Sequence, residues 1–208
     1  MIKHIIFDLG NVLVQIHPER TIAALAGECG KPFSALQSLF LSRIHDDLME
    51  GKLTPQQFHE RFMAKYGCRI SYPRFLAHWE SLIGDFKPGI AEVVSQLASR
   101  FTLSVCSNTD PLHWQLVCRN GTFLRQFHHY FLSYELKCLK PNSLLFTRML
   151  KNLGTKGREC IFIDDTADNI RAAETLGIQG IHASDTPAIV QGLQRLGVEV
   201  EISGPARG

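Results

Sequence analysis

Residues 2–14, IKHIIFDLGNVLV, carry the clearest indication of the fold in this chain of 208 residues. Three consecutive apolar residues, Ile5 to Phe7, lead directly into Asp8. A short, continuously apolar run of this kind is typical of a strand whose two faces are both buried in a parallel sheet. We therefore predict a first strand over residues 2–8, with a carboxylate at its carboxyl end.

Four further apolar runs extend this pattern toward the end of the chain. They lie at residues 102–107, 129–133, 160–164 and 179–182. Apolar residues at helical spacing occupy three stretches between them, residues 90–99, 143–153 and 168–176. Strands that alternate with helices form a parallel, doubly wound sheet. The predicted fold class is therefore α/β, with a Rossmann-like core.

Residues 17–85 interrupt the alternation, because they contain helical patterns and no convincing strand. The predicted helices cover residues 22–27, 33–48, 55–66 and 72–83. We predict an all-helical domain at residues 16–85, inserted into a core made of residues 1–15 and 86–208. Four phenylalanines at helical spacing are expected to form the core of the inserted domain, namely Phe40, Phe58, Phe62 and Phe75.

Charge and cysteine usage restrict the class of protein. The chain has 22 Lys+Arg and 20 Asp+Glu, a net charge of +2, and no block of like charges, which argues against nucleic-acid and membrane partners. Its apolar runs are too short for a signal peptide or a membrane span, so we expect a cytoplasmic protein. The sequence predicts no particular oligomeric state. Without C-x-x-C or patterned histidine spacing, we expect reduced thiols and neither a disulfide framework nor a zinc site. The six cysteines are Cys29, Cys68, Cys106, Cys118, Cys138 and Cys160.

Polar side chains follow four of the predicted strands. They are Asp8, Ser107 with Asn108, Lys140, and Asp164 with Asp165. Ligands of open parallel sheets bind beyond the carboxyl ends of the strands. We therefore expect these residues to meet in one site.

The composition of this set points to phosphate chemistry. Three carboxylates close together repel one another unless a cation joins them, and Mg²⁺ suits one or two carboxylates plus a substrate phosphate. Lys140 adds a positive charge, and Ser107 and Asn108 can donate hydrogen bonds to phosphate oxygens. The set fits a nucleophilic carboxylate that attacks a phosphoryl group.

Four segments resemble the motifs of the haloacid dehalogenase (HAD) superfamily of hydrolases. They are IIFDLGNVLV at residues 5–14, SVCSNTD at 104–110, ELKCLKPN at 135–142 and CIFIDDTADN at 160–169. The helical insertion resembles the type 1 cap of that superfamily. The segment FDLGNVLV is similar to the α-D-glucose-1-phosphate phosphatase branch, which also has glycine at the position of Gly10.

The resemblance implies a role for each residue. Asp8 would be the nucleophile that forms an aspartyl-phosphate, and the phosphoryl group would be held by Ser107, Asn108 and the catalytic Lys140. Magnesium would be bound by Asp8, the backbone carbonyl of Gly10 and Asp165, with Asp164 supporting the cluster. Pro141 makes Lys140 a better match than Lys137. The implied substrate is a small phosphorylated metabolite, with sugar phosphates among the candidates.

Gly10 departs from the phosphatase pattern. These enzymes usually carry a second Asp there, which protonates the leaving group, and removing a general acid costs roughly 10²–10⁴ in rate. The enzyme can use leaving groups that need little protonation, such as those of sugar 1-phosphates. Alternatively, His17 or Glu19 replaces the acid. A third alternative is weak or lost catalysis, which would leave a phospholigand-binding regulator.

Dehalogenases of the superfamily also lack the second Asp, so a 2-haloacid dehalogenase is a further alternative. The acidic pair Asp164–Asp165 suits a metal and counts against it, and the halide-binding arginine has only loose matches in Arg20 and Arg43. The hypothesis is therefore a magnesium-dependent phosphatase. Five residues of the insertion are candidate substrate contacts, namely His17, Arg20, Arg43, His45 and Trp79.

Overall fold

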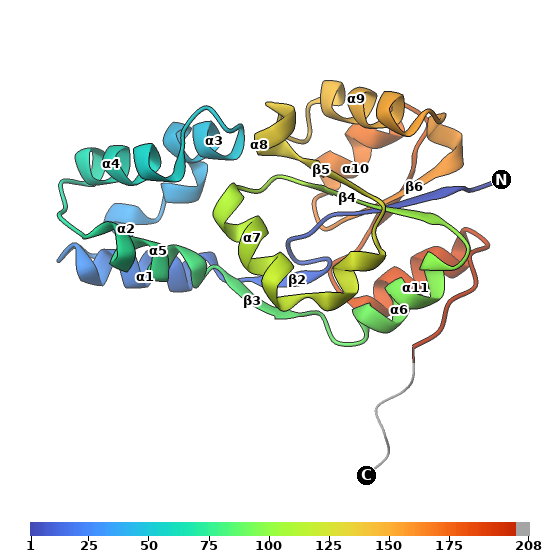
Figure 1. The fold of residues 1–208 in the computed structure, drawn as a ribbon, viewed down its shortest axis with the longest axis horizontal. Coiled ribbons are helices and arrows are strands. Elements are labelled where there is room, and N and C mark those ends of the chain that lie inside the picture. Colours follow the sequence, from blue (N-terminus) through green and yellow to red (C-terminus); the bar gives the residue numbers. More distant parts are fainter. Residues whose placement is uncertain (203–208) are drawn as a thin grey trace, which may run out of the picture.

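A five-stranded parallel sheet forms the centre of the larger part of the protein (Figure 1), in a computed structural model that describes residues 1–202. The strand order is β5-β4-β1-β6-β7, and every neighbouring pair is parallel. The five strands predicted for the core and its α/β fold class are confirmed. Their bounds are β1 (His4–Phe7), β4 (Thr102–Ser107), β5 (His129–Leu132), β6 (Cys160–Asp164) and β7 (Gln179–His182).

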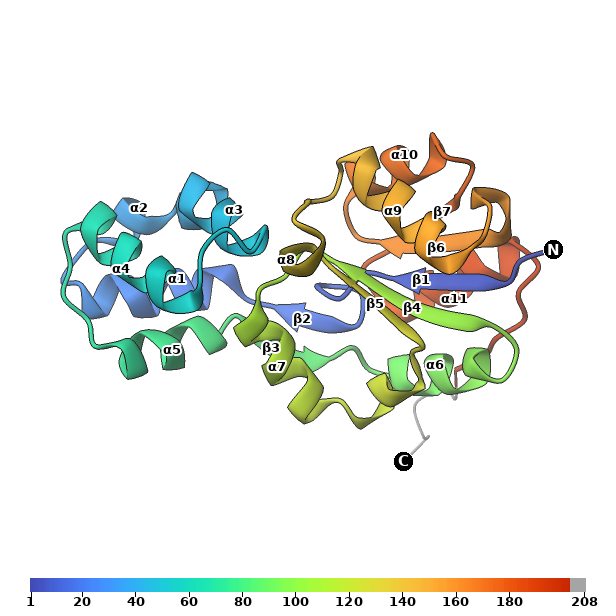
Figure 2. The same ribbon diagram turned by 45° about the horizontal axis from the view of Figure 1, so that its top comes forward.

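Helices cover both faces of this sheet (Figure 2). Because side chains alternate along a strand, Ile5 and Phe7 of β1 face one layer and Ile6 faces the other. All three are fully buried, and each such side chain contributes roughly 1.5–3 kcal/mol of transfer free energy. The first layer holds α6 (Ile90–Ala98), α7 (Pro111–Asn120) and α11 (Thr186–Arg195). The second holds α9 (Ser143–Leu153) and α10 (Ala167–Glu174). Shorter elements are α8 (Ser133–Leu136), η2 (Thr122–Gln126) and η3 (Gly157–Glu159).

A second body, which we call the helical lobe, consists of the helices between residues 18 and 80 (Figure 1). Its own hydrophobic core contains Phe58, Phe62, Phe75 and Trp79, all fully buried, whereas Phe40 packs at the margin of that core. The lobe contains α1 (Pro18–Glu28), α2 (Phe33–Leu36), η1 (Leu39–Leu41), α3 (Arg43–Met49), α4 (Pro55–Tyr66) and α5 (Tyr72–Glu80).

Local hydrogen bonding explains where helices of the lobe begin and end. Thr54 caps α4 with a capping box, in which its hydroxyl accepts from the Gln57 N–H and the Gln57 side chain accepts from the Thr54 N–H. The single helix predicted over residues 33–48 is wrong. Ser42 adopts an extended conformation and its hydroxyl donates to the Leu39 carbonyl, which ends η1 before α3 begins.

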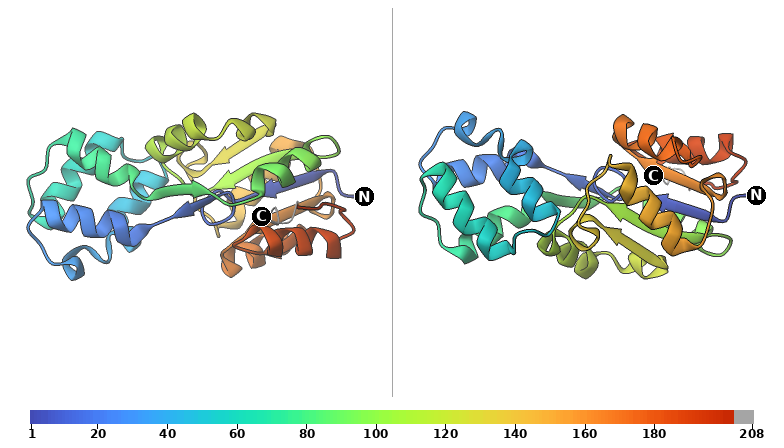
Figure 3. Two further views of the ribbon diagram at one scale, coloured as in Figure 1. Left: turned by 90° about the horizontal axis from the view of Figure 1, so that it is seen from below. Right: turned by 90° about the horizontal axis from the view of Figure 1, so that it is seen from above.

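A two-stranded antiparallel ribbon connects the helical lobe to the sheet (Figure 3). It consists of β2 (Val14–Ile16) and β3 (Ile83–Phe86). The prediction that residues 17–85 contain no strand is therefore wrong. The β3 sequence, IGDF, has no apolar run, and its pairing with β2 across some 70 intervening residues exists only in the folded chain. The predicted domain boundaries fall inside this ribbon, and the division into two domains remains a prediction.

The cysteines differ from expectation at one pair. Cys29, just after α1, is joined by a disulfide to Cys68, which follows α4, so the prediction of six reduced thiols is wrong for these two. Their separation of 39 residues gives no sequence pattern, because only the packing of the lobe brings them together. Cys106, Cys118, Cys138 and Cys160 are free thiols. Within residues 1–202, no helix is both long and apolar enough to cross a membrane.

Candidate active site

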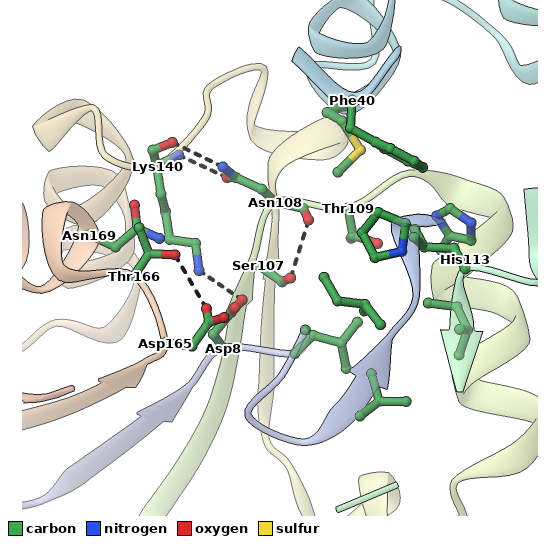
Figure 4. Close-up of a pocket in the computed structure, with 18 of the residues that line it drawn as sticks. Asp8, Phe40, Ser107, Asn108, Thr109, His113, Lys140, Asp165, Thr166 and Asn169 are labelled. Atoms are coloured by element: carbon green, nitrogen blue, oxygen red, sulfur yellow. Dashed lines mark hydrogen bonds and ion pairs between the residues drawn. The ribbon is translucent and has the colours of Figure 1, made fainter. Parts of the chain in front are cut away.

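The carboxyl ends of β1, β4 and β6 meet at a cavity of about 290 Å³ between the sheet and the helical lobe (Figure 4). β1 supplies Asp8, β4 supplies Ser107 with the following Asn108, and Asp165 follows β6. Lys140 reaches the same end of the cavity from the loop before α9. The structure thus brings together the side chains that the strand ends predict.

Lys140 is a buried cation between two carboxylates. Its Nζ donates to Asp8 Oδ1 at 2.8 Å and to Asp164 Oδ2 at 2.6 Å, and the residue is 4% exposed. Burial alone would lower the pKa of Lys140, but the charges of Asp8 and Asp164 outweigh burial and raise it. Lys137 instead donates to the Gly51 carbonyl at the surface, so Lys140 is the lysine at the site.

Asp164 lies behind the cavity wall and is fully buried. Its Oδ1 accepts from the Thr166 N–H at 2.8 Å and from Asn169 Nδ2 at 3.0 Å, while its Oδ2 accepts from Lys140. These bonds hold Asp164 against Lys140 rather than leaving it open to a ligand. Asn169 was missed by sequence reasoning, although its position near the start of α10 places it directly after the DDTAD segment.

Asp8 and Asp165 are the two carboxylates that line the cavity. Burial raises the pKa of Asp8 to about 6, and the attraction of Lys140 limits that rise. Asp165 is half-buried and accepts a hydrogen bond from Asn11 Nδ2 at 2.9 Å. Asn11 has a left-handed backbone with φ of 55°, a conformation that asparagine tolerates better than most residues. The side chain of Asn11 is a second contribution that the sequence reasoning missed.

The three carboxylates fit a divalent cation. One oxygen from each of Asp8, Asp164 and Asp165 lies within 4.8 Å of the other two. Closely spaced carboxylate oxygens are the ligands that Mg²⁺ prefers in proteins. Because Asp164 is fully buried and does not line the cavity, Asp8 and Asp165 are the members of this cluster that can face an ion in the cavity.

The two short polar residues at the end of β4, Ser107 and the following Asn108, have different roles in the structure. The Asn108 amide forms a two-bond clamp with the backbone of Lys140, accepting from its N–H at 2.8 Å and donating to its carbonyl at 2.9 Å. Ser107 Oγ has only a long contact of 3.5 Å to the Asn108 carbonyl. Ser107 is therefore free to donate to a ligand, whereas Asn108 fixes the loop that carries Lys140.

The opposite end of the cavity is formed by the ribbon and the helical lobe (Figure 4). Of the five candidate contacts from the insertion, His45 lines the cavity. Trp79 is buried in the lobe core, and Arg43 pairs with Asp47 at 3.0 Å. His17 Nδ1 lies 3.6 Å from Glu19, and neither of these two proposed acids lines the cavity, nor does Arg20.

Gly10 lines the cavity beside Asp8 and carries no acid. A Cβ at this position would meet Ile16 at 3.5 Å, which is ordinary van der Waals contact. The glycine is therefore not required by crowding around its Cα atom.

A buried ion pair lies where α7 meets the helical lobe. His113 Nδ1 donates to Asp110 Oδ2 at 2.7 Å, and Nε2 donates to the Trp79 carbonyl at 2.8 Å. Trp79 Nε1 in turn donates to Asp110 Oδ2 at 3.2 Å. Because both ring nitrogens face acceptors, His113 is doubly protonated in this arrangement. Burial would lower the pKa of His113, but the Asp110 carboxylate outweighs burial and raises it.

Known proteins share this architecture. Over 186 residues the chain is 25% identical to the D-ribitol-5-phosphate phosphatase of Bacteroides thetaiotaomicron, covering 86% of this chain and 90% of that protein. A HAD family enzyme from the same species, crystallised with magnesium and inorganic phosphate, superposes with a TM-score of 0.79 at 28% identity, covering 86% of this chain and 93% of that chain.

A HAD-like family hydrolase from Porphyromonas gingivalis shares the fold over 96% of this chain and its own full length, with a TM-score of 0.84 and 24% identity. The family model of haloacid dehalogenase-like hydrolases matches residues 2–177. The chain therefore belongs to the haloacid dehalogenase-like hydrolase family.

Proposed function

We propose that this protein is a magnesium-dependent phosphatase that hydrolyses a small phosphorylated metabolite through an aspartyl-phosphate on Asp8. The observation that carries the proposal is the position of Asp8, which lies at the cavity between the Lys140 ammonium and the cavity-lining Asp165. Support also comes from the relatives, one named as a D-ribitol-5-phosphate phosphatase and one crystallised with magnesium and inorganic phosphate.

Magnesium is the cofactor that fits this site, held by Asp8, the Gly10 carbonyl and Asp165, with Asp164 behind them. When bound, it supplies positive charge that offsets the carboxylates and the oxygens of the transferring phosphoryl group. Lys140 contributes a further positive charge, since its Nζ lies 2.8 Å from Asp8 Oδ1. Ser107 has a free hydroxyl to donate to a phosphate oxygen.

The reaction has two displacement steps. An Asp8 carboxylate oxygen bonds to phosphorus as the bond from phosphorus to the substrate oxygen breaks. That oxygen leaves as an alkoxide and takes its proton from water, because Gly10 supplies no acid. Water then adds to the phosphorus of the aspartyl-phosphate, which releases inorganic phosphate and restores Asp8. Lys140 and Ser107 hold the phosphoryl oxygens during both steps, while Asn108 and Asp164 keep Lys140 in place.

The helical lobe would act as a type 1 cap that closes over the substrate, with residues 16–85 as the inserted domain. We also propose a cytoplasmic enzyme whose partner is a small metabolite and not a nucleic acid or a membrane. Halide release from 2-haloacids is not favoured, because Asp8 lies in a cluster with the carboxylates of Asp164 and Asp165, which suits a metal.

The test is hydrolysis of p-nitrophenyl phosphate with and without Mg²⁺, by the wild type and by Asp8→Asn. We expect turnover that EDTA abolishes and excess Mg²⁺ restores. Asp8→Asn should lose at least about 10³-fold in kcat, because it removes the nucleophile, with an unchanged circular dichroism spectrum.

Lys137→Met is the matched control, since this lysine lies at the surface, and it should retain wild-type activity. Turnover without metal, or activity retained by Asp8→Asn, contradicts the proposal.

A further inference from the structure

The cavity has two chemically different ends. Its charged side chains gather where β1, β4 and β6 end, whereas the end toward the helical lobe is mainly apolar, with His113 on the same side as Phe40 (Figure 4). The labelled Phe40 projects into that second end, away from Asp8 and Lys140. Besides Pro18, the apolar lining on this side includes six larger side chains, namely Val14, Ile16, Phe40, Met49, Leu82 and Ile83.

Few groups at the apolar end can satisfy hydroxyls of a ligand. Thr109, His45 and His113 are the polar side chains that line this part of the cavity, and the centroid of the His45 ring lies 5.2 Å from that of Phe40. Both ring nitrogens of His113 are already bonded, to Asp110 and to the Trp79 carbonyl. A polyol chain placed here would find the Thr109 side chain and the unpartnered Nδ1 of His45 as its side-chain partners among the residues described. Its remaining hydroxyls would lose water without a replacement, which is costly for each unpaired group.

The apolar end also lacks a cation for a second anionic group. Among the residues described, Lys140 is the only lysine or arginine that lines the cavity. Burial lowers the pKa of His45, although the carboxylates of Asp110 and Asp46 oppose this, and the charge of His113 is paired with Asp110. A substrate carboxylate or second phosphate would therefore find no counter-charge at this end.

Size restricts the ligand further. The cavity of about 290 Å³ lies at the small end of the range for ligand pockets, roughly 300–1,000 Å³. Part of that volume is adjacent to Asp8, Ser107 and Lys140 and would be filled by the phosphoryl group. The remaining space suits a compact group and not a long chain.

We propose that the preferred substrates are phosphate monoesters of compact, mainly apolar alcohols, either aryl, benzyl or short branched alkyl, and not of polyols or sugars. This inference rests on the proposed phosphatase function and names the class of leaving group that the site accepts. The phosphoryl end binds what all substrates share, and the six apolar side chains of the ribbon and the lobe select the organic group.

A comparison of substrates with similar leaving groups tests this. Benzyl phosphate and 3-methylbutyl phosphate are compared with ribitol 5-phosphate and glucose 6-phosphate, because all four release primary alkoxides. We expect kcat/KM to be at least roughly tenfold higher for the apolar pair, since apolar contacts of even methylene size discriminate by about this factor. Equal rates, or a preference for the polyol pair, overturn the inference.

Two variants locate the selectivity. Met49→Gln places an amide of similar length in the apolar end and should reduce the preference for benzyl phosphate by about tenfold. Leu41→Gln is the matched control, because Leu41 is 87% exposed and does not line the cavity, and it should leave the preference unchanged. Thermal melts of both variants establish that they fold. An unchanged preference in folded Met49→Gln contradicts the assignment of the apolar end.

A binding measurement separates this inference from the proposed function. If no ester releases phosphate, the phosphatase proposal fails. The apolar end can then still be tested by thermal unfolding of the wild type with Mg²⁺ present, comparing the protection given by benzylphosphonate with that given by inorganic phosphate. Stronger protection by benzylphosphonate supports the apolar end as a binding site even without turnover. Equal or weaker protection by benzylphosphonate overturns it.

Discussion

Asp8, which directly follows β1, is held in position by a chain of two buried side chains from other parts of the fold, Lys140 and Asp164. Lys140 bonds to it at 2.8 Å, and Asp164 holds Lys140 from behind at 2.6 Å. Removing one member of such a buried charge set typically lowers the free energy of unfolding by roughly 3–5 kcal/mol, because an unpaired charge remains. The same bonds that position the proposed nucleophile thus also tie β1, β6 and the Lys140 loop together.

Under the proposed function, Gly10 would restrict the range of leaving groups, because it places no acid beside Asp8. Since a Cβ is tolerated there, Gly10→Asp can supply the missing acid beside Asp8. We expect roughly a 10²-fold gain in kcat/KM for phenyl phosphate, at the lower end of general-acid effects, and little change for p-nitrophenyl phosphate, whose leaving group needs no proton.

Gly10→Asn is the control, because it has the size of Asp without its acidity. The measurement is the dependence of rate on leaving-group pKa, which should be steep in the wild type and in Gly10→Asn and flatter in Gly10→Asp. Equal gains from Asn and Asp would show that the effect is steric, and a shallow wild-type dependence would reveal another acid.

The residues of the candidate site differ in how far the sequence predicts their position. Asp8, Ser107 and Asp165 were predictable, because each lies at the end of an apolar strand and parallel strands bring their ends together. The clamp by which Asn108 holds Lys140 was not, because it joins residues 32 positions apart in two loops. Asn11 and Asn169 were missed for a different reason, because asparagine at a turn or a helix start has many ordinary roles.

Asp110, the last residue of the SVCSNTD segment, helps to join α7 to the helical lobe. Asp110 caps α7 by accepting from the Leu112 and His113 N–H groups, and it also pairs with the His113 ring. The ring reaches the Trp79 carbonyl of α5, so a single buried ion pair connects the core to the lobe.

This ion pair predicts a pH dependence of stability. The folded-state pKa of His113 is raised, so the stabilisation is complete below the unfolded histidine pKa of about 6.5 and is lost as pH rises through the folded pKa. The pKa of Asp110 is lowered, because its partners outweigh burial, so its contribution is lost only at acid pH, below the usual Asp range.

We expect His113→Gln to lower the free energy of unfolding by about 3 kcal/mol near pH 6, and by progressively less toward pH 9. Denaturant unfolding across this range measures both effects. Asp110→Asn, which removes the carboxylate that raises the histidine pKa, should remove the slope that the wild type shows over the same range. Parallel pH profiles for wild type and His113→Gln would contradict this assignment.

Elements differ in how far the sequence predicts them. The core strands were predictable because continuous apolar runs such as CIFID are rarely anything else. β3 was not, because IGDF has neither alternation nor a run, and a ribbon is stable only once both of its strands are in place. The break within residues 33–48 depended on one serine hydroxyl bonding to a nearby carbonyl, which hydrophobic periodicity does not report.

At the scale of the whole molecule, the net charge of +2 conceals a cluster of three carboxylates with a single lysine among them. Binding of Mg²⁺ to the folded state alone should therefore stabilise the protein. At a concentration 100 times its Kd, the gain is about 2.7 kcal/mol, which corresponds to a rise in Tm of roughly 5–10 °C for a chain of this length.

Differential scanning calorimetry with Mg²⁺ and with EDTA measures this shift. Asp165→Asn removes one carboxylate that lines the cavity and should lose most of the rise. Asp168→Asn is the control, because Asp168 pairs with Arg171 at the surface of α10, and it should keep the full rise. An equal rise in Asp165→Asn would place the ion elsewhere.

The antiparallel ribbon has a consequence for how such proteins diversify. Because β2 and β3 leave the core as paired neighbours, the helical lobe enters and exits the fold at one place. The lobe is thus a module that can be exchanged for another without altering the order of strands in the sheet. The chemistry of Asp8 would be inherited unchanged while Phe40, Met49 and their neighbours were replaced as a set. Substrate choice in this fold can therefore evolve by swapping one contiguous stretch of gene.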